Sequence, residues 1–125
     1  EDELLTEVEI DPLPGGLRTA YTRFTTRSKE DKPCISISVA VAPEDDGKTC
    51  GEARIGLGGV EAVFRRFTVA EDVLKGVELA PAAIDAALSG TLDDLEPLSD
   101  IRASGDYRRQ VTPVFIRRTL LKAIS

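Results

Sequence analysis

Three charged residues recur at four-residue intervals between Tyr21 and Pro33 and are the first candidates for chemistry in this chain. They are Arg23, Arg27 and Asp31, in a segment that changes from Thr and aromatic residues to Ser, Lys and Glu. By composition the segment predicts the end of a strand followed by a solvated hairpin corner. Any contact with a ligand is expected in its charged loop half.

The other side chains exclude the common catalytic arrangements. The sequence has no His, and its two cysteines, Cys34 and Cys50, lie in apolar or strand-like surroundings. A Ser/His or Cys/His nucleophile therefore cannot be built, and Cys and His ligands are too few for a zinc site. The acidic pairs at 45–46 and 93–94 fall in predicted turns, where a solvated role is expected. These residues alone predict a domain that binds or assembles something and does not catalyse.

Length and charge indicate one domain with an acidic N-terminal segment. The chain has 125 residues, 42% of them hydrophobic, which suffices for one core. Its net charge of -6 arises in residues 1–11, which hold six acids and no base. The remaining body is neutral, so it lacks the basic excess of a nucleic-acid surface, and no apolar run approaches the roughly 18 to 20 residues of a membrane span. Two cysteines in such a chain are expected to be reduced core residues of a cytoplasmic protein.

Alternating patterns predict strands in the first half of the chain. Residues 4–10 alternate apolar and acidic side chains and predict a half-buried strand before the Pro- and Gly-rich stretch 11–16. Residues 17–26 and 34–41 predict two more strands, and 49–57 predicts the antiparallel partner of 34–41. In 34–41, Ile and Val occupy one face and Cys, Ser and Ala the other. The large side chains are expected in the core, and a helix is expected against the small ones.

The second half predicts helices. Residues 68–76 combine a capping-box pattern with a terminal Gly, and 81–90 form an Ala-rich segment that begins with Pro. Ser104 is expected to cap a last helix, in which Pro113 should introduce a kink or a break. Strands followed by helices favour an α+β two-layer sandwich, with an antiparallel sheet of three to four strands packed on one face by about three helices.

Six short motifs follow one another over nearly the whole chain. They are ELLTEVEI at 3–10, YTRFTTR at 21–27, ARIGLGGV at 53–60, AEDVLKG at 70–76, SGDYRR at 104–109 and IRRTL at 116–120. As an ordered set they resemble the C-terminal domain of the FAD-binding (medium) subunit of molybdenum hydroxylases. That family includes the medium subunit of aerobic carbon monoxide dehydrogenase and the flavin domain of xanthine dehydrogenase.

The resemblance implies a place within a larger flavoprotein. Residues 1–14 are then the tail of a preceding FAD-binding subdomain with its linker, and 15–125 are the C-terminal-like domain. The implied parent is an oxidoreductase that passes electrons from a molybdenum site through iron–sulfur clusters to FAD and an acceptor. Its expected partners are a molybdopterin-binding large subunit and an iron–sulfur small subunit. FAD is held mostly by the preceding subdomains, and no turnover is expected from this domain alone.

The resemblance also assigns candidate cofactor residues. Family members often carry Lys-Phe, Arg and Asp at four-residue intervals near the flavin ring, and the matching positions here are Arg23, Arg27 and Asp31. Arginine at position 23 keeps the charge of the family's lysine and changes its hydrogen-bond geometry. These three residues are predicted to border the flavin.

Two alternatives remain open at this stage. In the first, the chain is an assembly domain whose last helix docks partner subunits through Tyr107, Arg108 and Arg109 while the flavin is held elsewhere. In the second, it is a free-standing binding domain without flavin contact.

Overall fold

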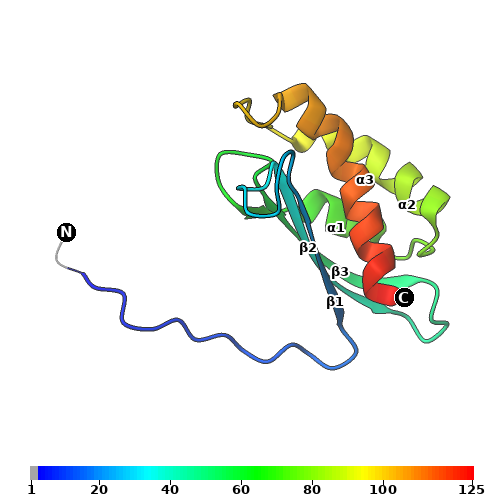
Figure 1. Ribbon diagram of the computed structural model, residues 1–125. Coiled ribbons are helices and arrows are strands. Elements are labelled where there is room, and N and C mark those ends of the chain that lie inside the picture. Colours follow the sequence, from blue (N-terminus) through cyan, green and yellow to red (C-terminus); the bar gives the residue numbers. More distant parts are fainter. Residues whose placement is uncertain (1–2) are drawn as a thin grey trace.

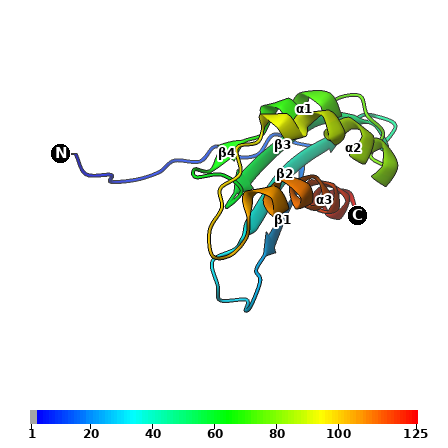
Figure 2. The same ribbon diagram turned by 90° about the horizontal axis from the view of Figure 1, so that it is seen from above.

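A four-stranded antiparallel sheet carries helices on one of its two faces (Figures 1 and 2). The computed structural model describes residues 3–125. The strands lie in the order of the sequence and are β1 (Arg18–Phe24), β2 (Ile35–Pro43), β3 (Cys50–Gly58) and β4 (Arg65–Arg66). The helices are α1 (Thr68–Leu74), α2 (Pro81–Leu88), the 3₁₀ helix η1 (Ser89–Asp94) and α3 (Gly105–Ile124). The predicted α+β two-layer sandwich is confirmed.

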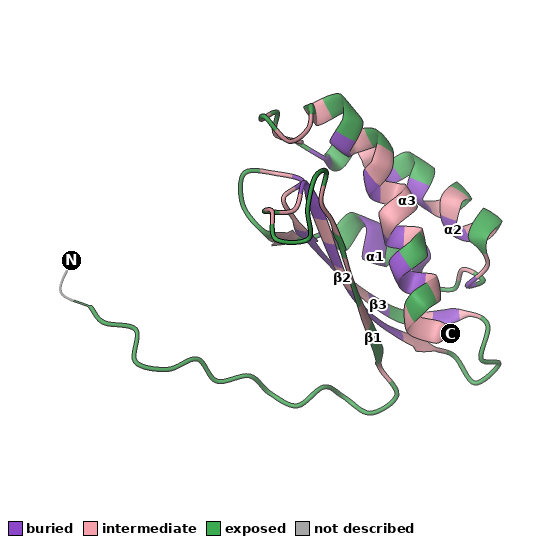
Figure 3. Ribbon diagram, viewed as in Figure 1, coloured by how far each residue is buried: buried purple, intermediate pink, exposed green. Residues whose placement is uncertain are grey.

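The core lies between the sheet and the helices, and Figure 3 shows buried residues gathered there. Strand β2 supplies Ile35, Ile37, Val39 and Val41 to it, each at most 4% exposed. Both cysteines are buried and free, which confirms the prediction that they are reduced core residues. None of the helices in residues 3–125 is long and apolar enough to cross a membrane.

The helices cover the large-residue face of β2, so the prediction that a helix packs on the small-residue face was wrong. Burying Ile and Val releases more free energy than burying Ser, because hydrophobic stabilisation scales with the apolar area removed from water. The small-residue face is instead open at Ser36 and Ser38, which are only partly buried, whereas Cys34, directly before β2, lies in the core.

The backbone is crowded at the Gly-rich end of β3. A Cβ atom at Gly56 would lie 2.5 Å from Ser38 Oγ and 2.7 Å from the ring of Phe64. Gly59 follows with φ of 72° and ends the strand in a tight bend. The missing side chain at Gly56 thus allows an aromatic ring to lie directly on the open face.

The capping box predicted at the start of α1 was wrong. Thr68 already lies inside the helix, and no side chain caps its N-terminus. The Glu71 carboxylate turns toward the sheet, where Oε1 accepts the backbone N–H of Ile55 at 2.7 Å and Oε2 pairs with Arg66 at 2.5 Å. A buried carboxylate gains more from these tertiary donors than from a helix end exposed to water.

Helix α3 begins as predicted and continues where a break was expected. Ser104 Oγ accepts the backbone N–H of Tyr107 at 3.2 Å, which confirms the predicted cap. Pro113 lies inside one uninterrupted helix. Contacts after Pro113 fasten α3 to β1, including the Phe24–Phe115 ring pair at 5.1 Å and the Thr119–Thr22 hydroxyl bond at 2.8 Å. This packing offsets the backbone hydrogen bond that proline cannot donate.

The N-terminal segment leads away from the sheet as an extended, exposed chain (Figure 1). The half-buried strand predicted at 4–10 is absent, because among residues 3–125 no strand pairs with it. Residues 1–2 of the predicted subdomain tail lie outside the described residues.

Replacing one residue on each face of β2 tests which face is the core. Ile37→Ala leaves a cavity and should reduce the free energy of unfolding by roughly 2 to 5 kcal/mol, since Ile37 is fully buried. Ser38→Ala on the open face is the matched control and should change it by less than about 0.5 kcal/mol. Urea unfolding followed by circular dichroism measures both, and equal losses would contradict the assignment.

The β2–β3 turn should contribute to acid sensitivity. Asp46 accepts the side-chain hydroxyl of Thr49 and the backbone N–H groups of Thr49 and Lys48, and these bonds lower its pKa to about 2. The stabilisation is therefore complete above the ordinary carboxyl pKa near 4 and is lost as the pH falls through about 2.

Urea unfolding between pH 2 and 5 measures this contribution. Asp46→Asn should flatten the decline in stability over that range, whereas the neighbouring exposed Asp45→Asn should leave the decline unchanged. If stability declines identically with pH in the two variants, the hydrogen bonds of Asp46 do not contribute to acid sensitivity.

Candidate functional site

The open face of the sheet forms a groove with a floor of backbone and small side chains. One row across the sheet runs from Tyr21 through Ser38 and Gly56 to Arg66, each residue being the cross-strand neighbour of the next. Tyr21 is 53% exposed, and Phe64, over Gly56, is 67% exposed. The groove has a volume of about 800 Å³, within the typical range for ligand sites of about 300 to 1,000 Å³.

Three cationic side chains also line this groove, and each has an internal partner. Arg54 pairs with Glu52 at 2.7 Å, and Arg66 pairs with the buried Glu71. Lys122 on α3 donates to the backbone carbonyl of Tyr21 at 3.1 Å. These contacts fix the positions of the cations, so the groove combines aromatic and small apolar surface with positive charge held at defined points.

Two of the three predicted flavin-bordering residues hold the loop after β1 together. Arg23, on the open face opposite Ser36, donates from Nη2 to the backbone carbonyl of Asp31. The Asp31 carboxylate accepts the backbone N–H of Ser28 at 3.0 Å. Arg27 is exposed and has no ion-pair partner within residues 3–125. Of the three, Arg27 has the side chain most available to a ligand, and the flavin contact itself stays a prediction.

A smaller cavity of about 230 Å³ lies between this loop and the turn before α3. Arg27, Asp31 and Lys32 line it from the loop, and Ile101 and Arg102 line it from the turn. Residues separated by some seventy positions in the chain therefore share one cleft, which the four-residue spacing alone could not indicate.

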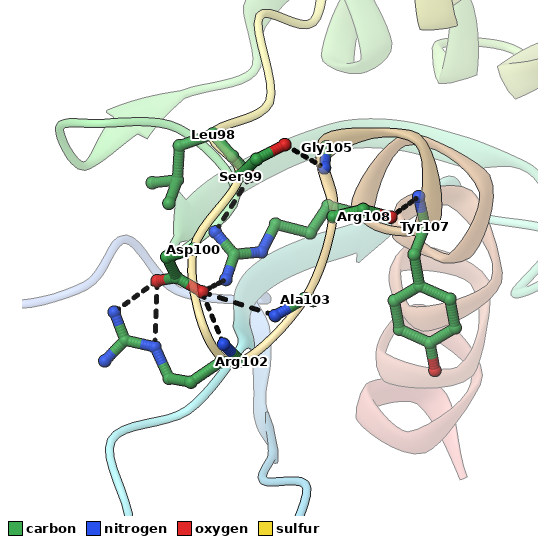
Figure 4. Close-up of polar contacts among 9 residues, drawn as sticks. Leu98, Ser99, Asp100, Arg102, Ala103, Gly105, Tyr107 and Arg108 are labelled. Carbon is green, nitrogen blue, oxygen red and sulfur yellow. Dashed lines mark hydrogen bonds and ion pairs between the residues drawn. The ribbon is translucent and has the colours of Figure 1, made fainter.

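The turn before α3 is organised by the carboxylate of Asp100 (Figure 4). Its Oδ1 accepts Nη2 of Arg108 at 2.6 Å and the backbone N–H of Arg102 at 2.8 Å, and its Oδ2 accepts Nε of Arg102 at 3.0 Å. The hydrogen bond from the Arg102 side chain is the largest cause that holds the pKa of Asp100 far below its usual range. Arg108 is 1% exposed, and its Nη1 also donates to the Leu98 carbonyl at 3.1 Å.

The predicted docking residues at the start of α3 have unequal access to solvent. Tyr107 is 40% exposed, whereas Arg108 is buried against Asp100 and Arg109 donates to the backbone carbonyl of Leu92. The role of Arg108 in docking stays a prediction, and its visible contacts are internal.

Sequence reasoning missed the aromatic side chains of the groove and the exposed tip of the turn. Strand alternation already placed Tyr21 on one face with Arg23, so its exposure could have been inferred once the buried face was known. A glycine inside a strand, such as Gly56, indicates that another group approaches the backbone closely. No nearby sequence pattern identified the Phe64 ring as that group. Ile101 sits in a segment without periodicity, so its exposure had no sequence signal.

A helix-backed antiparallel sheet with an open, grooved face defines a domain of the α+β class. Residues 20–123 match the family model of the CO dehydrogenase flavoprotein C-terminal domain. The chain belongs to this family, which confirms the resemblance to the flavoprotein subunits of molybdenum hydroxylases.

Curated relatives are subunits of larger enzymes. The chain is 34% identical over 122 residues to the nicotine 6-hydroxylase medium subunit of Paenarthrobacter nicotinovorans, covering 98% of this chain and 41% of that protein. It is 30% identical to the carbon monoxide dehydrogenase medium chain of Afipia carboxidovorans, covering 97% and 41%. The chain thus spans about 41% of the length of these relatives.

Solved structures share the fold. Quinoline 2-oxidoreductase from Pseudomonas putida 86 superposes with a TM-score of 0.77 at 29% identity, covering 90% of this chain and 38% of that chain. Reconstituted CO dehydrogenase from Oligotropha carboxidovorans gives a TM-score of 0.78 at 28% identity, with the same coverage.

Substitutions around Asp100 should show that Arg108 depends on it. Asp100→Asn removes the charge that compensates the buried Arg108 guanidinium, so it should be clearly destabilising. Arg102→Gln removes only a partly exposed ion pair and should cost less than about 1 kcal/mol. Thermal unfolding compares the two variants, and a larger loss for Arg102→Gln would refute this order.

Proposed function

We propose that this chain is the C-terminal domain of the FAD-binding subunit of a molybdenum-containing oxidoreductase and that it borders the flavin. The open groove carries the proposal, because it presents exposed aromatic rings and fixed cations on a domain of the CO dehydrogenase flavoprotein family. FAD supplies the redox chemistry when bound, and the protein supplies its orientation and electrostatic surroundings.

The residues of the groove suit a flat aromatic ligand with polar edges. Tyr21 and Phe64 offer exposed rings for stacking or edge contacts. Phe64 lies over Gly56, so its ring and the short Ser38 side chain form the surface that a ring system would meet. Arg66, held by Glu71, places a cation near the groove for a polar or anionic edge.

The loop after β1 would form the border of this site. Arg23 lies on the same face as Tyr21 and holds the loop through the carbonyl of Asp31, while the Asp31 carboxylate closes the loop internally. Arg27 keeps its guanidinium free for a contact with the cofactor. In this arrangement Arg23 and Asp31 position the loop and Arg27 is the contacting residue.

The proposed parent passes electrons from iron–sulfur clusters to FAD and on to an acceptor. Its partners in this proposal are a molybdopterin-binding large subunit and an iron–sulfur small subunit. The names of the relatives, which are medium subunits or chains, support this. Residues 1–14 would be the tail and linker of a preceding FAD subdomain, and 15–125 this domain. The free cysteines Cys34 and Cys50 fit the cytoplasmic location that we include in the proposal.

An assembly role without flavin contact is the second candidate. The half-exposed Tyr107 at the start of α3 favours it, since Tyr is enriched at protein interfaces. Flavin content and subunit association, measured on the same variants, separate the two functions.

Reversing the charge at Arg27 tests the flavin contact. In the full-length subunit, Arg27→Glu should raise the Kd for FAD by roughly tenfold, because a charge-assisted hydrogen bond contributes about 1.5 to 3 kcal/mol. Lys29→Glu is the matched control, since Lys29 is an exposed cation of the same loop that does not line the cleft, and it should leave the Kd unchanged. Fluorescence titration of the apoprotein measures the affinity.

The flavin reduction potential provides a second measurement on the same variants. Removal of a nearby cation should lower the potential, because an anionic reduced form loses a favourable charge. An unchanged FAD affinity together with an unchanged potential in Arg27→Glu would remove the proposed contact and favour the assembly role.

A further inference from the structure

Ile101 occupies an unusual position for a large apolar side chain. It is 94% exposed at the tip of the turn before α3, more than any other large hydrophobic side chain in residues 3–125. A single exposed apolar residue is ordinary on a protein surface. Here the exposed side chain stands on a turn whose backbone is fixed from several sides.

Several hydrogen bonds hold the backbone of this turn in place. The Asp100 carboxylate accepts the backbone N–H groups of Arg102 and Ala103 at 2.8 and 3.3 Å, and Asp100 N donates to the Ala103 carbonyl at 3.1 Å. Beneath the turn, the buried Arg108 holds both Asp100 and the carbonyl of Leu98. Ile101 is therefore presented in one backbone conformation, which lowers the entropy lost when such a residue binds a partner.

The surroundings of Ile101 are positively charged in a chain of net charge -6. The cleft that Ile101 lines also contains three cations, Arg27, Lys32 and Arg102, and one acid, Asp31. The Asp31 carboxylate accepts an internal hydrogen bond from its own loop. Lys32, in the cleft beside Ile101, has no ion-pair partner within residues 3–125. An approaching protein would meet an apolar tip next to uncompensated positive charge.

We propose that Lys32, Ile101 and Arg102 form a docking surface, the Ile101 surface, for an acidic patch on another subunit of the parent enzyme. Ile101 fits an apolar pocket on that subunit, and carboxylates around the pocket face Lys32 and Arg102. The inference rests on the proposed function, because the partner is one of the parent's own subunits. Arg27 lines the same cleft from the loop that carries Lys32, but it belongs to the proposed flavin border and not to this surface.

This surface changes the role of the predicted docking residue Arg108. Arg108 is buried, so it cannot contact a partner in this conformation. It acts as a positioning residue that holds Asp100, and Asp100 in turn holds the backbone that carries Ile101 and Arg102. The Arg108–Asp100 ion pair therefore holds the docking residues Ile101 and Arg102 in place.

The test uses the full-length parent chain and the subunits that co-purify with it. Ile101→Asp should weaken their association by roughly tenfold or more, as expected for a central apolar contact. Ile101→Ser should weaken it less, and both variants should keep the wild-type unfolding temperature because the side chain is exposed. Lys32→Glu should weaken association at about 50 mM NaCl and have less effect at about 500 mM, where screening shortens the reach of surface charges.

Matched controls come from α1, where Val73 is a half-exposed apolar residue and Lys75 follows as an exposed cation. Val73→Asp and Lys75→Glu should leave association unchanged. Unchanged association in Ile101→Asp and Lys32→Glu would overturn the inference, and so would the absence of any co-purifying subunit. A loss of FAD with normal association would also overturn it, by assigning Ile101 to the flavin site. The FAD content of the wild-type chain reports separately on the proposed function.

Discussion

The unlike faces of β2 determine the arrangement of the rest of this domain. Ile and Val on one face bring α1, α2 and α3 to the same side of the sheet, where the buried apolar side chains meet. Because every helix of the described residues 3–125 lies on that side, none of them covers the small-residue face. The alternation of large and small side chains along β2 therefore produces both the core and the groove. The core and the groove cannot be changed independently along this strand.

Short-range patterns in the sequence predicted the elements well. The strands predicted at 17–26, 34–41 and 49–57, the hairpin between β2 and β3, and the Ser104 cap each depend on residues close together in the chain, and all are present. The strand predicted at 4–10 is the exception. The orientation of the helices on the sheet was not predictable in this way, since alternation identifies two faces and leaves open which one is buried. At Pro113, tertiary packing outweighed the local preference for a break.

The candidate site was predicted only in part, because its geometry depends on residues distant in sequence. The spacing of Arg23, Arg27 and Asp31 located the loop, but the loop's internal bonds and its shared cleft with Ile101 arise from tertiary proximity. Glu71 looked like a helix cap and is instead a buried acceptor for β3. Charged residues are the hardest to assign from a sequence, because their best partners need not be neighbours.

The floor of the groove at Gly56 has a consequence for any ligand that changes its charge. Its nearest groups are the Ser38 hydroxyl and the apolar ring of Phe64, beside peptide units fixed by the hydrogen bonds of the sheet. Such a surface has few dipoles that can reorient when a neighbouring charge appears or disappears. A ligand on this floor would exchange electrons in surroundings that relax little, so the reorganisation energy contributed by the protein would be small. The absence of a side chain at one glycine would then affect the rate of electron transfer as well as the fit of the ligand.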